Sequence, residues 1–335
     1  MGYSVVIRRW LWCCAFAWSF YTSSALAWSL GNVLMTGISA GVEFTDNMAV
    51  GQRLAHTHCQ KQFFWHQWNC PTEEFLKRNH QPGPATREAA VVDALTAGAI
   101  AYSLTRNCSS GQIAGCTCQT RPTRRADDWQ WGGCSDNVEF GVRMSQQFLD
   151  HVPLNMPLHR ALLRLHNNQA GRELVRRSTR RLCKCHGVSG SCSMETCWTQ
   201  IADFTITAER VRRRYRKAKR LTLGSDGNDV SPTASVSFEG VRVTDLTYMD
   251  DSPDFCRTVA PNGDIGTRGR ECSRATGPGV THAERRSCKN LCRRCGRRVK
   301  RQVTEVKTSC NCKFHWCCQV TCDTCTQKSY KYTCR

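Results

Sequence analysis

The cysteines constrain the fold of this chain more than any other residues. The sequence holds 24 of them among 335 residues, a density that is normal in proteins exported to an oxidising compartment and hazardous in a reducing cytosol. The length allows one large or two moderate domains with a buried core. The cysteines therefore do more than hold a mini-protein together, and their number predicts an exported protein.

The amino terminus has the parts of a cleavable signal peptide. Two arginines precede an apolar stretch from Trp10 to Phe20, and small residues lead to an Ala-Leu-Ala triplet that ends at Ala27. We predict a signal peptide over 1–27 and a protein secreted through the endoplasmic reticulum into the extracellular space and matrix. The alternative is a retained membrane anchor, but polar residues between 19 and 24 interrupt the apolar run. No later segment is apolar over the length of a transmembrane helix.

Cysteine density also divides the mature chain. Loss of Cys13 and Cys14 with the signal peptide leaves 22 cysteines, an even number that a complete set of eleven disulfides requires. Twelve of the 22 lie between Cys256 and Cys334, and a stretch after Leu223 is rich in the Gly, Ser, Asp, Asn and Pro residues of linkers. We predict a signal peptide over 1–27, a helical domain over 28–222, a linker over 223–249 and a cysteine-rich domain over 250–335.

Apolar residues at helical spacing predict that the first domain is a helical bundle stapled by disulfides. Thr86 is the expected N-cap of a helix that reaches Arg106, and Asp136 with Glu139 has the form of a capping box. The second domain has few such stripes and short β-like runs, which predict a small disulfide-framed β domain. Before it, within the linker, Val241, Val243 and Leu246 predict a strand. The two remaining helical stripes are Leu158, Ala161, Leu162 and Leu165, and Ile201, Phe204, Ala208, Val211, Tyr215 and Ala218.

Four cysteines from 183 to 197 predict a projecting hairpin. They can nest, with Cys183 and Cys197 as an outer pair and Cys185 and Cys192 as an inner pair, although sequence alone does not fix the pairing. The tip of this hairpin would present Ser189 between two glycines that permit tight turns.

Three other interpretations of this motif are open. Its Cys-x-Cys-His segment has the residue types of a zinc site, but a secreted chain with many other thiols favours disulfides. Its Gly-Val-Ser-Gly-Ser segment nearly matches the nucleophile elbow of a hydrolase, but it departs at the last position, and cysteines flank it where the elbow needs a strand and a helix. The turn is also compatible with a purely structural role.

A second cysteine cluster, over 310–325, predicts another hairpin by the same nesting. Cys310 would pair with Cys325 and Cys312 with Cys322, which leaves a nine-residue tip from Lys313 to Thr321. Three apolar side chains, those of Phe314, Trp316 and Val320, lie in this tip, which is too small to bury them all. They therefore indicate a docking surface, the alternative being that they pack on a neighbouring domain.

Together these motifs resemble those of the Wnt family. The carrying segments are Cys183 to Cys192 (Cys-Lys-Cys-His-Gly-Val-Ser-Gly-Ser-Cys) and Cys310 to Cys318 (Cys-Asn-Cys-Lys-Phe-His-Trp-Cys-Cys). The resemblance runs from about Cys59 to Cys334 and implies the two-domain Wnt fold, with a helical domain that bears a hairpin and a small cysteine-rich β domain. Shorter matching segments are 68–71, 105–108, 131–136 and 165–168, and similarity to the Wnt-eight subgroup rests on 132–141, 251–256 and 284–288.

The resemblance implies a secreted signalling ligand and developmental morphogen that catalyses nothing and needs no cofactor or metal. Ser189 matches the serine that the acyltransferase Porcupine esterifies with palmitoleate in the endoplasmic reticulum, and the carrier Wntless exports the lipidated protein. The acylated hairpin acts as a thumb that enters the cysteine-rich domain of a Frizzled receptor, the second hairpin acts as a finger, and a co-receptor related to the low-density-lipoprotein receptor is recruited. Matching receptor contacts are Lys184, His186, Val188 and Ser189 in the thumb and Phe314, Trp316, Cys317, Cys318 and Val320 in the finger.

The resemblance also implies the disulfide pairing, because the order of the cysteines matches. All 22 mature cysteines are used. In the first domain the implied pairs are Cys59–Cys70, Cys108–Cys116, Cys118–Cys134, Cys183–Cys197 and Cys185–Cys192. In the second they are Cys256–Cys295, Cys272–Cys288, Cys292–Cys334, Cys310–Cys325, Cys312–Cys322 and a bond between the neighbours Cys317 and Cys318.

Charge and short motifs add three expectations. The formal net charge of +20 indicates a polyanionic partner, which outside the cell is heparan sulfate rather than nucleic acid, with Arg210 to Arg220 and Arg293 to Arg301 as candidate patches. Merely solvated basic faces are the alternative. Asn107 lies in the single Asn-x-Ser/Thr sequon and is the predicted N-glycan site. Arg298 to Arg301 has the form of a furin site, and any cleaved fragments would stay joined by disulfides.

Two rival classes of function make different predictions. A secreted enzyme or inhibitor would use an unmodified Ser189, and a structural matrix protein would not bind Frizzled at all. The sequence does not identify the preferred Frizzled, the co-receptor contact residues or the signalling branch.

Overall fold

A computed structural model describes residues 38–73, 75, 78, 83–119, 130–153, 156–222, 237–257, 266–316 and 319–335. The predicted signal peptide and the Cys317–Cys318 pair lie outside these residues, as does the first half of the predicted linker. Two compact units make up the described chain. The first holds its residues up to Arg53, those from Ala99 to Phe148 and those from Ser178 to Ala202, and the second holds all the others.

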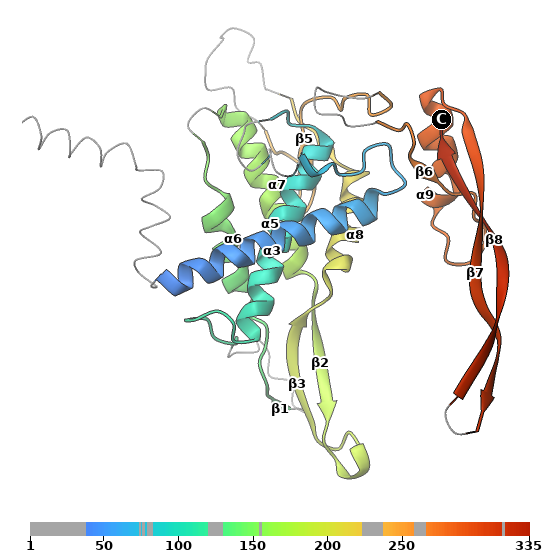
Figure 1. Ribbon diagram of the computed structural model, residues 1–335. Helices are drawn as coiled ribbons and strands as arrows, with labels where there is room; N and C mark the ends of the chain where they lie inside the picture. Colours follow the sequence, from blue (N-terminus) through green and yellow to red (C-terminus); the bar gives the residue numbers. More distant parts are fainter. Residues whose placement is uncertain are drawn as a thin grey trace, which may run out of the picture. The chain divides into compact units, whose positions relative to one another are not determined.

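Helices dominate the chain before the predicted linker, and strands dominate after it (Figure 1). This confirms the predicted fold class. The longer helices are α3 (Ile38–Phe63), α5 (Arg87–Ser109), α6 (Val138–Leu149), α7 (Leu158–Arg176) and α8 (Phe204–Tyr215), and α9 (His282–Arg285) is a single turn. The strands are β1 (Gln130–Trp131), β2 (Thr179–Cys185), β3 (Glu195–Ile201), β4 (Lys219–Arg220), β5 (Thr247–Tyr248), β6 (Glu271–Cys272), β7 (Val299–His315) and β8 (Gln319–Cys334).

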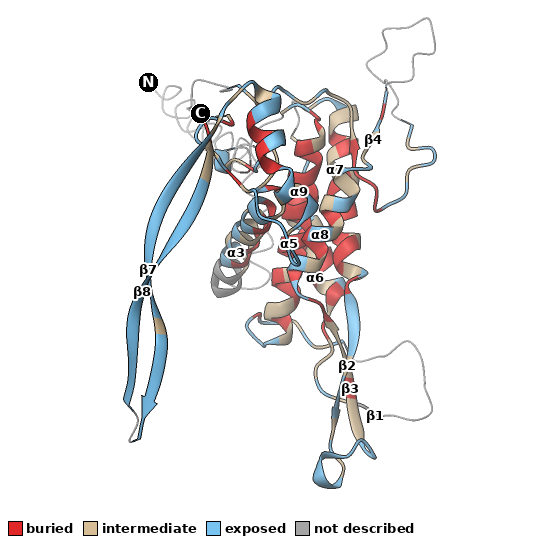
Figure 2. Ribbon diagram, turned by 90° about the vertical axis from the view of Figure 1, so that its right-hand side faces the viewer, coloured by how far each residue is buried: buried red, intermediate tan, exposed pale blue. Residues whose placement is uncertain are grey.

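Helix α5 is the most deeply buried element, and its small residues allow neighbouring helices to pack closely against it. Every residue from Val91 to Ala101 is buried (Figure 2). Alanine and glycine allow close approach of other helices: a Cβ added to Gly171 of α7 would lie 1.8 Å from the carbonyl oxygen of Ala94. The two helices therefore pack backbone against backbone at this point, and Gly171 cannot be replaced without separating them.

Side-chain caps fix where three of the helices begin. They correct the expected cap of α6 and the expected first residue of α8. Thr86 caps α5 as predicted, because its hydroxyl accepts the Ala89 N–H at 3.2 Å. Helix α6 is capped by Asn137, whose side chain accepts the Phe140 N–H at 3.1 Å, so Asp136 does not form the expected capping box. Helix α8 begins only at Phe204, because Asp203 accepts the Thr205 N–H at 2.8 Å.

Two strand expectations also change. Ile201, expected to begin the last helical stripe, is the final residue of β3. The strand expected near Val241 to Leu246 is instead a turn, in which the Asp245 N–H donates to the Arg242 carbonyl at 2.8 Å. The strand β5 follows it and pairs in parallel with β4.

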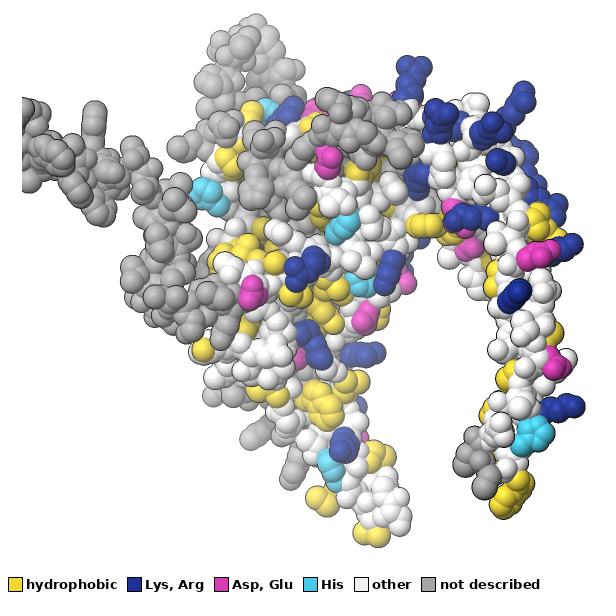
Figure 3. Space-filling model, viewed as in Figure 1, with side chains coloured by type: hydrophobic (Ala, Val, Ile, Leu, Met, Phe, Trp, Pro, Cys, Tyr) yellow, Lys and Arg dark blue, Asp and Glu magenta, His cyan; other side chains and the backbone are white. Residues whose placement is uncertain are grey.

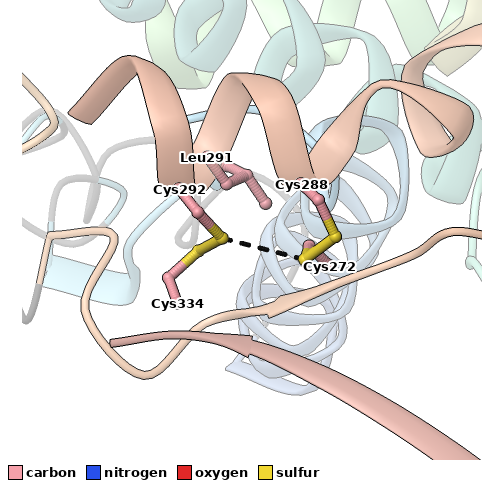
Figure 4. Close-up of a cluster of buried hydrophobic side chains, with 5 residues drawn as sticks. All are labelled: Cys272, Cys288, Leu291, Cys292 and Cys334. Carbon is pink, nitrogen blue, oxygen red and sulfur yellow. Dashed lines mark hydrogen bonds between the residues drawn. A yellow bond between two sulfur atoms is a disulfide. The ribbon is translucent and has the colours of Figure 1, made fainter. Parts of the chain in front are cut away.

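Disulfides replace an apolar core in the cysteine-rich segment. Cys272–Cys288 and Cys292–Cys334 pack around Leu291, and all five of these residues are buried (Figure 4). Outside this cluster β7 and β8 form a long two-stranded ribbon that is almost wholly exposed (Figure 2). Its hairpin is far longer than the expected segment 310–325, because pairing runs from His315↔Gln319 back to Val299↔Cys334.

Within the second unit, the turn after α3 anchors the cysteine-rich segment. The Arg270 guanidinium donates to the carbonyl oxygens of Phe64 at 2.7 Å and Gln67 at 2.6 Å. The Gln67 amide in turn donates to the Asn290 carbonyl at 3.1 Å. Burial lowers the pKa of Arg270 to about 10, and the hydrogen bonds to two carbonyls compensate its charge. This contact joins residues more than 200 positions apart.

Candidate functional site: two disulfide-clamped hairpins

The first hairpin, which we call the thumb (183–197), has the clamp that its cysteines predict. Strands β2 and β3 pair antiparallel, with Cys183 directly opposite Cys197. The Cys183–Cys197 and Cys185–Cys192 disulfides close it at two levels, with Cα–Cα distances of 4.1 and 4.6 Å. Both thiols of the Cys-x-Cys-His segment are thus consumed, which leaves no thiolate for zinc.

The tip of the thumb is held by backbone hydrogen bonds. The His186 N–H donates to the Met194 carbonyl at 2.7 Å, and the Gly187 N–H donates to the Ser191 carbonyl at 2.8 Å. Ser189 has a φ of 54°, in the left-handed region, and sits in a short turn between two strands rather than at the strand-to-helix turn of a nucleophile elbow.

All four expected thumb contacts, Lys184, His186, Val188 and Ser189, are exposed. Val188 is 89% exposed. Met194, which the sequence analysis did not single out, is 65% exposed. Met194 lies between Cys192 and Cys197, and this position within the clamped hairpin is the sequence feature from which its exposure could have been predicted. The tip therefore offers a hydroxyl flanked by exposed apolar side chains.

Asp136 fixes the base of the thumb within the first unit. Its buried carboxylate accepts the Ile201 N–H at 2.8 Å and lies 3.6 Å from the Arg106 guanidinium. Its own N–H donates to the Thr199 carbonyl at 2.9 Å. The residue that the sequence predicted as a helix cap therefore holds the end of β3 instead.

The second hairpin tip, which we call the finger (312–322), is more apolar than the thumb. Phe314 is 70% exposed, Trp316 96% and Val320 58%. Phe314 and Val320 are direct cross-strand partners, so they share one face of the ribbon. Hydrophobic side chains are visible at the ends of both hairpins in Figure 3. Solvent exposure of such side chains at a loop tip is costly unless a partner covers them.

Ten disulfides are present among the described residues, and they coincide with ten of the eleven pairs that the resemblance implies. The eleventh, Cys317–Cys318, lies outside those residues. The ten are Cys59–Cys70, Cys108–Cys116, Cys118–Cys134, Cys183–Cys197, Cys185–Cys192, Cys256–Cys295, Cys272–Cys288, Cys292–Cys334, Cys310–Cys325 and Cys312–Cys322.

The two basic segments differ in how their charges are used. In Arg210 to Arg220 several cations have partners: Arg214 lies 2.9 Å from Asp245, and Arg220 lies 3.1 Å from Asp251. In Arg293 to Arg301 most cations are exposed, and Figure 3 shows Lys and Arg gathered over this part of the molecule. The second segment therefore presents more of its positive charge to solvent.

Two other predicted sites lie in ordered backbone. Asn107 is in the last turn of α5, where its side-chain amide donates to Asn47. The furin-like segment runs into β7. Arg298, just before this strand, exchanges hydrogen bonds with Arg335, and Arg301 within it is paired with Tyr332. A protease would have to strip this segment from β8 to bind it as an extended substrate, which disfavours cleavage.

The chain belongs to the Wnt family, which it matches over residues 32–335. It is 42% identical to Protein Wnt-8c of Gallus gallus over 321 residues, which span 93% of this chain and 89% of that protein. It is 41% identical to Protein Wnt-8 of Xenopus laevis over 324 residues, which span 94% and 89%. These relatives confirm both the family and the resemblance to the Wnt-eight subgroup.

A solved structure agrees with this assignment. The chain resembles one in the structure of human WLS in complex with WNT8A, with a TM-score of 0.63 and 38% sequence identity over 92% of this chain and 100% of that one. Wnt family members are developmental signalling ligands, not enzymes, and need no cofactor, so this chain is a signalling ligand. Among the described residues, no helix combines the length and apolar character needed to cross a bilayer.

Proposed function

We propose that this Wnt is secreted, acylated on Ser189, and binds the cysteine-rich domain of a Frizzled receptor through its thumb and finger. The observation that carries the proposal is the tip of the thumb, where an exposed serine stands on a doubly clamped hairpin between exposed apolar side chains. Two disulfides hold a tip that has no buried residues, so they do not stabilise a core there. Their role is to hold the tip rigidly in a shape that a partner can bind.

The energetics fit this division of labour. A buried CH₂ contributes about 0.8 kcal/mol, so a palmitoleoyl chain could supply roughly 10 kcal/mol before ordering costs. That contribution is large but does not depend on which receptor supplies the apolar groove. Discrimination among receptors would come from protein contacts, chiefly Phe314, Trp316 and Val320 in the finger. Cys317 and Cys318 are proposed contacts by resemblance alone.

Secretion of an acylated chain requires partners. We propose Porcupine as the acyltransferase and Wntless as the carrier, because a single exposed acyl chain makes a secreted protein poorly soluble. WNT8A, which this chain resembles, forms a complex with human WLS. A co-receptor related to the low-density-lipoprotein receptor would complete the signalling complex, and Asn107 would carry an N-glycan.

Heparan sulfate is a proposed matrix partner of the 293–301 segment. Exposed Arg293, Arg294 and Arg298 are the groups to test, because each phosphate- or sulfate-like contact makes binding depend on salt. Their joint replacement by serine should lower the salt concentration at which the protein elutes from heparin. The same change at Arg210, Lys219 and Arg220, whose side chains already contact a carbonyl or a carboxylate of the protein, is the control and should have a smaller effect.

Mass spectrometry of the 185–197 peptide from active secreted protein tests the proposal. A palmitoleoyl ester on Ser189 is the expected result. Ser191 is an internal control, since its hydroxyl lies on the same tip and 3.1 Å from that of Ser193. Unmodified Ser189 in active material would refute the lipid-dependent mechanism and favour the rival in which the free hydroxyl acts.

A further inference from the structure

The ribbon of β7 and β8 has an edge that is only partly covered. Strand β6 pairs with β8 at two positions, Glu271↔Thr333 and Cys272↔Tyr332. From Ser273 onward the chain leaves the sheet, and no other described strand takes its place on that edge. Strand β8 continues for another thirteen residues, to Gln319. A free strand edge offers unpaired N–H and C=O groups to another chain.

The hydrogen-bond pattern shows which backbone groups face this free edge. The Cys334 N–H donates to the Arg270 carbonyl at 3.0 Å, whereas the neighbouring Arg335 exchanges hydrogen bonds of 2.8 and 3.0 Å with Arg298, next to the start of β7. In an antiparallel ladder these directions alternate along the strand. The N–H and C=O groups of Tyr330, Lys328 and Thr326 therefore point toward the side that β6 leaves open.

A groove of about 770 Å³ lies beside the uncovered part of β8, within the second unit. One side is formed by the strand from Gln327 to Tyr332, and Trp65 from the turn after α3 contributes an aromatic surface. Residues 273–275, which continue from β6, also line it. The groove thus has aromatic walls next to a row of backbone groups with which no other described strand pairs.

The charges of the groove and ribbon favour an acidic occupant. Arg274 lies over the Tyr332 ring at 5.1 Å from its centroid, and Lys328 is exposed on the same face of β8 as Tyr330 and Tyr332. Two carboxylates also line the groove, but that of Glu271 is paired with Lys331 at 2.9 Å, which leaves Glu284 as the opposing charge. From Val299 to Cys334 the chain has six Lys and Arg residues against two acidic ones.

We propose that this groove binds an extended acidic segment of a partner protein, which adds to β8 as a strand continuing the line of β6. Main-chain hydrogen bonds to Tyr330 and Lys328 would supply affinity, and side chains in alternate positions would supply specificity. A carboxylate beside Lys328 and an apolar side chain beside Tyr330 satisfy the two neighbouring positions. The site is separate from the thumb and finger, so it does not depend on the proposed function.

A matched pair of proline variants tests the inference. Lys328→Pro removes an N–H that points to the free edge near the groove, while the bonds of Gln327 and Ser329 to β7 remain. Glu305→Pro is the control, because Glu305 is the direct cross-strand partner of Lys328 and its N–H points to the opposite edge. Lys328→Ala and Glu305→Ala separate the loss of charge from the loss of the N–H.

The probe is a labelled twelve-residue peptide that repeats Val-Thr-Glu-Thr, which places valine and glutamate at successive positions on one face of a strand. A peptide that repeats Val-Thr-Lys-Thr is its counterpart. We expect the acidic peptide to bind the full secreted chain, Lys328→Pro to weaken it by about tenfold or more and Glu305→Pro to leave it unchanged. Equal binding to the lysine peptide, unchanged affinity in Lys328→Pro, or no binding at millimolar concentration would overturn the inference.

Hydrogen exchange on the unmodified protein gives a second test if Lys328→Pro fails to fold. Addition of the acidic peptide should slow exchange of the Tyr330 and Lys328 amides and leave the Glu305 and Val303 amides, on the other edge, unchanged. Absence of protection at Tyr330 and Lys328, or equal protection on both edges, would count against strand addition.

Discussion

Acid should weaken the attachment of the cysteine-rich segment through His66. This side chain lies in the turn after α3, and its Nε2 accepts a hydrogen bond from the Arg212 guanidinium at 3.3 Å. Burial, followed by the charges of Arg212, Arg216 and Arg270, lowers the pKa of His66 from 6.5 to about 4. Protonation would both break the hydrogen bond and add a fourth positive charge to the group.

The sign and size of the effect follow from linkage. Because the pKa of His66 is lower in the folded protein, the unfolded chain binds the proton first, and the stabilising contribution is complete only above about pH 6.5. It is lost as the pH falls toward about 4. The shift corresponds to about 3 kcal/mol in the free energy of unfolding, of which about 2 kcal/mol is lost by pH 5.

Denaturant unfolding followed by tryptophan fluorescence, repeated from about pH 7 to pH 4, measures this dependence. His66→Gln keeps an acceptor for Arg212 but cannot be protonated, so it should flatten the pH profile by about 2 kcal/mol at pH 5 relative to the parent chain. Replacement of the exposed His151 by glutamine is the control. Parallel pH profiles for His66→Gln and the parent would show that His66 is not responsible.

Two further predictions concern packing and the finger. Gly171→Ala should abolish secretion, because the added Cβ would lie 1.8 Å from the Ala94 carbonyl oxygen. Core overpacking of this kind lowers the free energy of unfolding by about 3 kcal/mol or more. Gly83→Ala is the control and should be secreted normally, because the nearest atom to its added Cβ lies at 3.6 Å. Trp316→Ala should be secreted but bind a Frizzled cysteine-rich domain at least about tenfold more weakly by surface plasmon resonance, since a buried aromatic anchor contributes about 2 kcal/mol or more. Normal secretion of Gly171→Ala, or full Frizzled affinity of Trp316→Ala, would contradict the respective argument.

Local chemistry explains which elements the sequence predicts well. The alanine-rich stretch after Thr86 forms a helix because its pattern and its cap agree. Closely spaced cysteines predict the thumb and the finger as hairpins, and the resemblance to the Wnt family implies how these cysteines pair. The tip residues Ser189, Phe314 and Trp316 are exposed because a clamped turn has no interior in which to bury them.

Long-range contacts explain the misses. The carboxylate of Asp136 holds β3 through Ile201, a partner 65 residues away that no local pattern indicates. Likewise, the contact of Arg270 with the turn at Gln67 joins segments 203 residues apart. The ribbon of β7 and β8 is longer than predicted because the part of it away from the tip, 299–309 and 326–334, lacks the apolar alternation by which strands are recognised.

The affinity of Ser189→Ala for a Frizzled cysteine-rich domain tests the central claim most directly. Protein secreted with and without the substitution would be compared by surface plasmon resonance, with Ser191→Ala as a control for changes in the same tip. An acyl chain that contributes several kcal/mol predicts a loss of more than about a hundredfold for Ser189→Ala and little change for Ser191→Ala. Equal affinities for Ser189→Ala and the parent protein would contradict the claim that this hairpin acts as a lipid-bearing thumb.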